Sequence, residues 1–148
     1  MQGIVNGILV IAHAPLASAL RQCVLHVFPE AQCVIDALDV PPDQPPEVTL
    51  AQARARLAAR GGGDMLVLTD LIGATPCNVA AQLGDGVHTF VVTGVNLPML
   101  LRAFTYRHEP IASLAARATA GGAQGVMPLK PATPCPPGLV PPSPAHDP

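Results

Sequence analysis

Two apolar segments of the chain each lead directly into a side chain with acid–base chemistry. The first is 7–12, which is followed by His13, and the second is 65–69, which is followed by Asp70. Runs of about six β-favouring residues bounded in this way predict buried parallel strands. The carboxyl ends of such strands form the edge of an open α/β sheet at which ligands bind. If the two strands are neighbours, an imidazole and a carboxylate meet at this edge.

Strand and helix patterns alternate along most of the chain. Two further apolar segments, 33–38 and 88–93, predict strands. Apolar periodicity, proline starts and a glycine run predict helices over 15–27, 47–60, from Pro76 onward, 98–106 and 112–120. Alternating elements imply right-handed crossovers. We therefore expect a single-domain, doubly wound α/β sheet of four parallel strands in the order 2-1-3-4, with helices on both faces.

The composition argues against several classes of function. A length of 148 residues fits one domain, and a net charge of −2 provides no basic surface for nucleic acid. No stretch approaches the roughly 20 apolar residues that a membrane span needs. No Lys or Arg precedes Arg21, which argues against a secretory signal. We therefore expect a cytoplasmic protein that neither binds nucleic acid nor inserts into a membrane.

The C-terminal end of the chain differs in composition from the rest. Residues 131–148 contain eight of the eighteen prolines and few side chains that form a core. Such a segment cannot compensate the entropy lost on ordering, so we expect a disordered, partly polyproline tail. The folded domain is then expected to span 3–130.

The pairing of His13 with Asp70 predicts a nucleophilic imidazole. In the order 2-1-3-4 the strands that precede these residues lie side by side, where the winding of the sheet reverses. A carboxylate that accepts the Nδ1 proton fixes the tautomer and leaves the Nε2 lone pair free to attack. We predict that His13 accepts a phosphoryl group and that Asp70 orients and stabilises its ring. The other histidines lack such a setting and are expected to be structural or exposed; they are His26, His88, His108 and His146.

The loop after Asp70 predicts a place for the phosphoryl group. Gly73 permits a tight turn, and Thr75 precedes Pro76 in the pattern of a helix N-cap followed by the first helical residue. Helix N-termini favour negative charge, and a second predicted helix begins at Pro15. The predicted phosphate-binding residues are Leu71, Gly73, Thr75 and Asn78.

Direct binding of a nucleotide is not indicated. The run 61–64 has no Lys-Ser/Thr and follows a helix, and 84–86 lacks the third glycine of a dinucleotide loop. The four cysteines form no CxxC pair, which gives no zinc spacing. We predict neither a metal nor a cofactor, so another protein is the expected phosphoryl donor. A thiol enzyme based on Cys77 at a helix N-terminus is a competing hypothesis.

Three segments carry a resemblance to a known family. They are 7–13, 69–78 and 93–100, and they include the pattern Thr-Asp-Leu-x-Gly-x-Thr-Pro-x-Asn with an upstream histidine. The chain resembles the enzyme IIA component of the mannose family of the bacterial sugar phosphotransferase system. The resemblance implies that His13 is phosphorylated by the phosphocarrier protein HPr, that Asp70 orients it, and that the phosphoryl group passes to a separate IIB protein.

The resemblance also implies an assembly and marks three departures. Similar proteins are homodimers in which a partner's C-terminal strand extends the sheet, which here implies a fifth, antiparallel strand over 125–130. Ala14 and Ala74 stand where the family usually has glycine, and Ile72 stands where it usually has phenylalanine. An alanine at a position that needs positive φ is strained by about 1–2 kcal/mol.

Two alternatives share the same chemistry. The chain can act as a regulatory module whose phosphorylation changes its binding to a partner outside transport, because a phosphoryl group adds about −1.5 to −2 charge. It can also be the phosphoryl donor subunit of a dihydroxyacetone kinase, which shares this fold.

Overall fold

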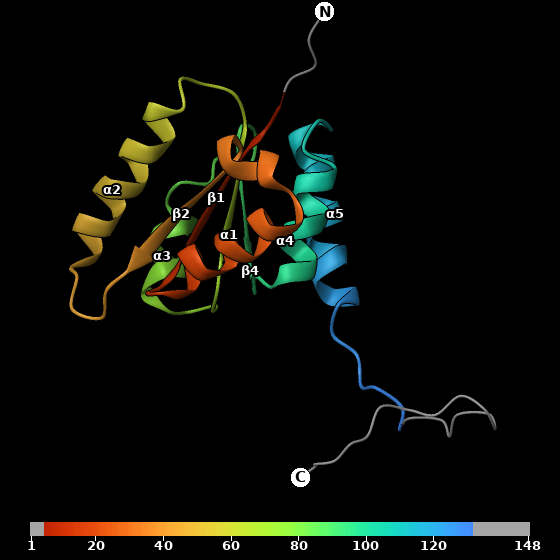
Figure 1. Cartoon of the computed structure of the whole chain (residues 1–148). Coiled ribbons are helices and arrows are strands. Elements are labelled where there is room, and N and C mark those ends of the chain that lie inside the picture. Colours follow the sequence, from red (N-terminus) through yellow and green to blue (C-terminus); the bar gives the residue numbers. More distant parts are fainter. Residues whose placement is uncertain (1–4, 132–148) are drawn as a thin grey trace, which may run out of the picture.

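The computed structural model describes residues 5–131, so the predicted tail lies outside the described residues except for Pro131. Within these residues, strands and helices alternate through the four strands, and two helices, α4 and α5, follow the last strand (Figure 1). The elements are β1 (Gly7–His13), α1 (Leu16–Val27), η1 (Pro29–Cys33), β2 (Ile35–Val40), α2 (Pro46–Ala59), β3 (Met65–Thr69), α3 (Thr75–Ala81), β4 (Thr89–Thr93), α4 (Leu97–Thr105) and α5 (Ile111–Gln124).

The four strands form one parallel sheet in the order β2-β1-β3-β4, which confirms the predicted topology. β1 lies between β2 and β3, with Ile8 opposite both Ile35 and Leu66. Because all four strands are parallel, their carboxyl ends share one edge of the sheet. His13 ends β1 at that edge, opposite Val40 of β2.

Helices cover both faces of the sheet, as Figure 1 shows. α1, α4 and α5 pack on one face against the even-numbered residues of β1 and β3, and α2 and α3 pack on the other face against the odd-numbered ones. Phe104 of α4 is 2% exposed and stacks with Phe28, at 5.1 Å between ring centroids. The other fully buried core side chains are aliphatic or methionine, and Phe90 and Tyr106 pack against them. None of the helices within 5–131 is long and apolar enough to cross a lipid bilayer.

Two elements differ from the prediction by more than one residue. β2 begins at Ile35 rather than at Cys33, because Pro29 opens a short 3₁₀ helix that includes the cysteine. α5 continues past the predicted end at Ala120 to Gln124. Its glycines allow α4 to approach closely: a Cβ on Gly122 would lie 2.6 Å from Met99 Cε. Helix packing thus outweighs the low helix propensity of glycine here.

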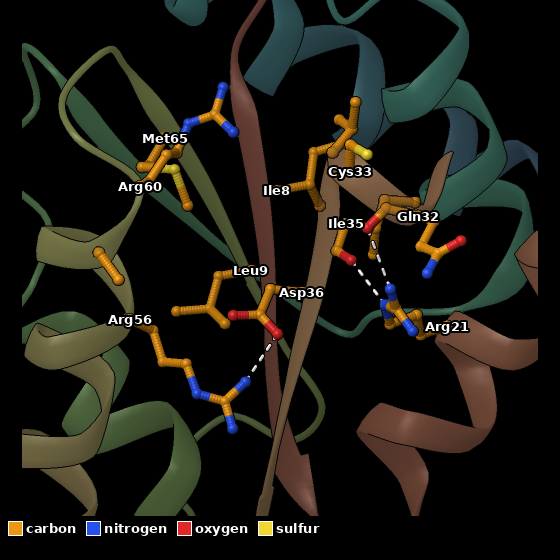
Figure 2. Close-up of a pocket in the computed structure, with 12 residues that line it drawn as sticks. Ile8, Leu9, Arg21, Gln32, Cys33, Ile35, Asp36, Arg56, Arg60 and Met65 are labelled. Carbon is orange, nitrogen blue, oxygen red and sulfur yellow. Dashed lines mark hydrogen bonds and ion pairs between the residues drawn. The ribbon is translucent and has the colours of Figure 1, made fainter. Parts of the chain in front are cut away.

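Side chains cover the outer edge of β2 (Figure 2). The alternation of a parallel ladder turns the backbone groups of Ile35 and Ala37 away from β1. Arg21 Nε donates to the Ile35 carbonyl at 2.6 Å, and Arg56 donates to the Ala37 carbonyl at 2.8 Å. Asp36 accepts the Ala37 N–H at 2.8 Å and also pairs with Arg56. Charged side chains in these positions protect an edge from pairing with another chain.

Candidate functional site

The structure brings His13 and Asp70 together at the carboxyl ends of β1 and β3. His13 Nδ1 lies 2.7 Å from Asp70 Oδ2, and the same oxygen accepts the backbone N–H of His13 at 2.9 Å. The other carboxylate oxygen accepts the N–H of Leu71 at 2.9 Å. The carboxylate therefore fixes both the ring and the main chain of His13, across 57 positions of sequence.

Asp70 is held in its charged form. Burial alone raises the pKa of Asp70, but hydrogen bonds from the His13 amide and ring, together with the charge of that ring, bring the pKa below its usual value. The carboxylate is then ionised at neutral pH, and Nδ1 of His13 carries the proton of the shared hydrogen bond. The Nε2 lone pair remains available as a nucleophile.

The two side chains differ in access to solvent. The side chain of Asp70 is 11% exposed, whereas that of His13 is 50% exposed. Leu71 and Ile72 beside them are also exposed, at 59% and 76%. A partner protein can therefore reach the imidazole without opening the fold, while the carboxylate that orients it stays shielded.

The loop before α3 offers unpaired N–H groups beside the pair. Gly73 has a φ of +86°, which explains the glycine in this turn. Within the described residues the backbone N–H groups of Ile72 and Gly73 have no hydrogen-bond partner. Asn78 Nδ2 donates to the Gly73 carbonyl at 3.3 Å and braces the turn. Two N–H groups near a helix N-terminus are a suitable setting for an anion.

The predicted cap of this helix is wrong by one residue. α3 begins at Thr75, and Ala74 occupies the N-cap position without a side-chain hydrogen bond. Ala74 adopts φ −85° and ψ 165°, an extended conformation that any residue tolerates. The alanine at this position is therefore free of the strain that positive φ would cause. Thr75 is half-buried at the first helical position.

The second helix near the site is capped by a side chain that sequence reasoning missed. α1 begins at Leu16 rather than Pro15, which occupies the N-cap position without a side-chain cap bond. Asp39, near the end of β2, instead accepts the backbone N–H of Ser18 at 3.0 Å and also the Ser18 hydroxyl. Asp39 follows the predicted strand segment 33–38, and no local pattern indicates its partner, 21 positions away.

A second histidine–carboxylate pair lies at the other end of the sheet, where the strands begin. His88 Nδ1 lies 2.8 Å from Asp64 Oδ1, just before β4 and β3 begin. The hydrogen bond and charge of Asp64 raise the pKa of His88. This carboxylate partner was not anticipated from the sequence, but the His88 side chain is exposed as predicted, at 71%. α1 and α3, the helices that begin near His13 and Asp70, follow the carboxyl ends of β1 and β3 and so begin at the other end of the sheet.

Asp85 gives the loop before β4 a distinct pH dependence. Its carboxylate accepts the N–H groups of Val87, His88 and Thr89, and these bonds lower its pKa to about 2. A depressed folded-state pKa stabilises the fold above the ordinary value near 4, and the contribution is lost as the pH falls toward 2. We expect Asp85→Asn to lower the melting temperature at pH 6, and the difference from wild type to vanish toward pH 2. Thermal unfolding followed by circular dichroism from pH 6 to pH 2 measures this; a constant difference would contradict it.

Other candidate sites do not assemble around His13. A cavity of about 260 Å³ lies beside the outer edge of β2, lined by Arg21, Arg56 and Arg60 among others, and it does not include His13 (Figure 2). Within 5–131 no group of three or more His, Cys, Asp or Glu side chains is placed to hold a metal ion. Cys77 is half-buried in α3.

Fold and site together define a class: a doubly wound α/β domain with a histidine–carboxylate pair at the point where the winding reverses. The model of the family described as PTS system fructose IIA component matches residues 7–119. The chain belongs to this family of phosphotransferase system IIA components and has a role in phosphoryl transfer.

Solved structures share the fold. The chain is 26% identical to the mannose/sorbose specific IIA subunit from Enterococcus faecalis, with 89% of this chain and 100% of that chain covered and a TM-score of 0.80. For the phosphotransferase system component EIIA from Streptococcus agalactiae the identity is 21%, the coverage 83% and 96%, and the TM-score 0.74. A sigma-54 interaction domain protein from Enterococcus faecalis is 14% identical to the chain, with 84% of this chain and 95% of that chain covered and a TM-score of 0.70. None of the curated protein sequences compared with the chain matches it.

Proposed function

We propose that the chain is a phosphohistidine carrier that accepts a phosphoryl group from HPr on His13 Nε2 and passes it to a IIB protein. The observation that carries this proposal is the 2.7 Å hydrogen bond between His13 Nδ1 and Asp70, which directs the second ring nitrogen outward. We assign residues 3–130 to this function. Leu71, Gly73, Thr75 and Asn78 form the proposed phosphate-binding loop.

The transfer needs only groups that lie at the site. The Nε2 lone pair attacks phosphorus, the new N–P bond forms, and the bond between phosphorus and the donor breaks with its electron pair leaving on the donor. The His13 ring then carries a positive charge, which the Asp70 carboxylate stabilises through Nδ1–H. The N–H groups of Ile72 and Gly73, which have no partner within the described residues, are the donors proposed for the phosphoryl oxygens. Transfer to the acceptor is the same step in reverse.

Phosphorylation of two histidine variants tests the proposal. With enzyme I, HPr and phosphoenolpyruvate, wild type should gain one acid-labile phosphoryl group, and His13→Ala should gain none. His88→Ala is the matched control, because it removes the other imidazole that is paired with a carboxylate. It should be labelled like wild type. Intact-mass spectrometry gives the readout, and labelling that survives His13→Ala would contradict the proposal.

The acceptor is tested by adding a purified IIB protein to the phosphorylated chain. Loss of the label from this chain and its appearance on IIB supports a carrier. A label that IIB does not remove would favour the regulatory alternative, in which the phosphorylated chain itself is the signal.

We also propose that the chain forms a homodimer through β4. The backbone groups of Val91 and Thr93 point away from β3 and have no partner within the described residues. Three apolar side chains follow α5 and are 65–87% exposed: Val126, Met127 and Leu129. A segment with such side chains suits an open strand edge of a second copy.

Truncation tests this assembly. We expect the full chain to sediment as a dimer at micromolar concentration and a chain that ends at Gln124 to sediment as a monomer. A variant that ends at Lys130 is the control, because it keeps the segment 125–130, and it should remain dimeric. A full-length monomer, or a dimer that survives truncation at Gln124, would contradict the proposal.

A further inference from the structure

Of the two helices that begin near His13, α1 already has an anion at its N-terminus. The first N–H groups of a helix have no partner within the helix, and that of Ser18, the third residue of α1, is bound by the Asp39 carboxylate at 3.0 Å. The Ser18 hydroxyl donates to the second carboxylate oxygen. The first turn of α1 holds no acidic residue of its own, so Asp39 supplies the charge from another element.

The backbone of Asp39 lies on the strand next to the one that ends in His13. It is opposite Ala12, the residue before His13, and neighbouring strands are about 4.8 Å apart. The next residue of β2, Val40, is opposite His13, and its carbonyl accepts the Ala14 N–H at 3.0 Å. The segment between His13 and α1 is thus fixed to β2 at both ends. These hydrogen bonds set the position of this segment relative to the Asp39 carboxylate.

We propose that Asp39 is a positioning residue that neutralises the N-terminus of α1 and thereby weakens the hold of the site on the phosphoryl group. This inference rests on the proposed function. Without Asp39, two helix N-termini would favour a phosphoryl group on His13. With it, only the loop before α3 does so, through the N–H groups of Ile72 and Gly73. The Asp39 charge also repels the phosphoryl oxygens.

A carrier benefits from this arrangement because it must release its phosphoryl group. The transfer between HPr and His13 exchanges one bond to phosphorus for another, so its equilibrium depends on how well each site stabilises the phosphorylated form. A carboxylate one strand away raises the free energy of the phosphorylated chain and leaves the bond-forming atoms untouched. The effect of Asp39 is therefore on the equilibrium position and on transfer to an acceptor.

The test is the phosphoryl equilibrium between HPr and the chain, measured by intact-mass spectrometry after enzyme I is removed. We expect Asp39→Asn, which keeps an oxygen for the Ser18 N–H but removes the charge, to shift this equilibrium toward the chain about two- to tenfold at low salt. The shift should shrink in about 1 M salt, where the Debye length is about 3 Å. A loss of helix packing would not produce that dependence on salt.

Two controls separate charge from structure. Ser18→Ala removes the hydroxyl bond and keeps the charge, and Glu30→Gln removes an exposed charge in η1, before β2 begins. Neither should shift the equilibrium by more than about twofold. If Asp39→Asn does not fold, Asp39→Ser replaces it, because a hydroxyl can also cap a helix.

The outcomes distinguish this inference from the proposed function. Absence of phosphorylation on His13 in wild type would contradict the proposed function itself. With wild type phosphorylated on His13, an unchanged equilibrium in Asp39→Asn, or a shift toward HPr, overturns the role of Asp39. An equal shift in Ser18→Ala or Glu30→Gln, or a shift that does not depend on salt, overturns it as well.

Discussion

Replacement of Asp70 by Asn is expected to slow phosphorylation of the chain by HPr by about 10²–10⁴-fold. The Asp70 carboxylate is the acceptor in all three of its hydrogen bonds, which come from the His13 amide, the His13 ring and the Leu71 amide. An amide side chain has one accepting oxygen, so its NH₂ group must face another N–H. The charge that stabilises the phosphorylated ring is also lost.

Rapid-quench kinetics with phosphorylated HPr, which give the rate of phosphorylation of the chain, measure this effect. Asp64→Asn is the matched control, because it makes the same change at the pair formed with His88, and it should leave the rate within about twofold of wild type. Asp70→Asn must retain its helical circular dichroism for the comparison to hold. A rate near that of wild type in a folded Asp70→Asn would contradict the assigned role of the carboxylate.

Replacement of Phe104 by Ala is expected to cost about 3–5 kcal/mol of the free energy of unfolding. Phe104 is 2% exposed in α4, its ring stacks with Phe28, and the Arg107 guanidinium lies 4.0 Å from its centroid. Alanine would leave a cavity beneath these two neighbours and lose both ring contacts. The free energy of unfolding of a typical domain is about 5–15 kcal/mol, so this cost is a large fraction of the total.

Urea denaturation followed by circular dichroism measures the loss. Val87→Ala serves as the control, because Val87 is 61% exposed and the substitution should change the free energy of unfolding by no more than about 0.5 kcal/mol. A cost below about 1 kcal/mol for Phe104→Ala would mean that the packing between α4 and α1 relaxes around the cavity.

The sequence predicted the sheet and the main pair because both follow from local patterns and topology. The apolar runs before His13 and Asp70 predicted β1 and β3, and the alternation of elements predicted their adjacency. The structure confirms that order and brings the two side chains within 2.7 Å. The family pattern around Thr69–Asn78 agrees with the family match.

The remaining features depend on contacts that no local pattern encodes. The capping of α1 by Asp39 joins residues 21 positions apart, and the His88–Asp64 pair joins residues 24 apart. Both partners come from separate elements whose ends meet only after the sheet forms. The start of β2 was misplaced because Cys33 and Val34 are apolar, as strand residues are, yet Pro29 opens a 3₁₀ helix there. The extent of α5 depends on packing of Gly122 against Met99.

The two outer strands of the sheet have unequal capacity to recruit another polypeptide. Arginine and aspartate side chains occupy the carbonyl and amide groups along β2, whereas Val91 and Thr93 on β4 leave theirs vacant within residues 5–131. In the proposed dimer, each copy places its segment 125–130 on β4 of the other, so that both open edges are filled. A reciprocal exchange of this kind would close at two subunits, whereas one-way donation from copy to copy would continue as a chain.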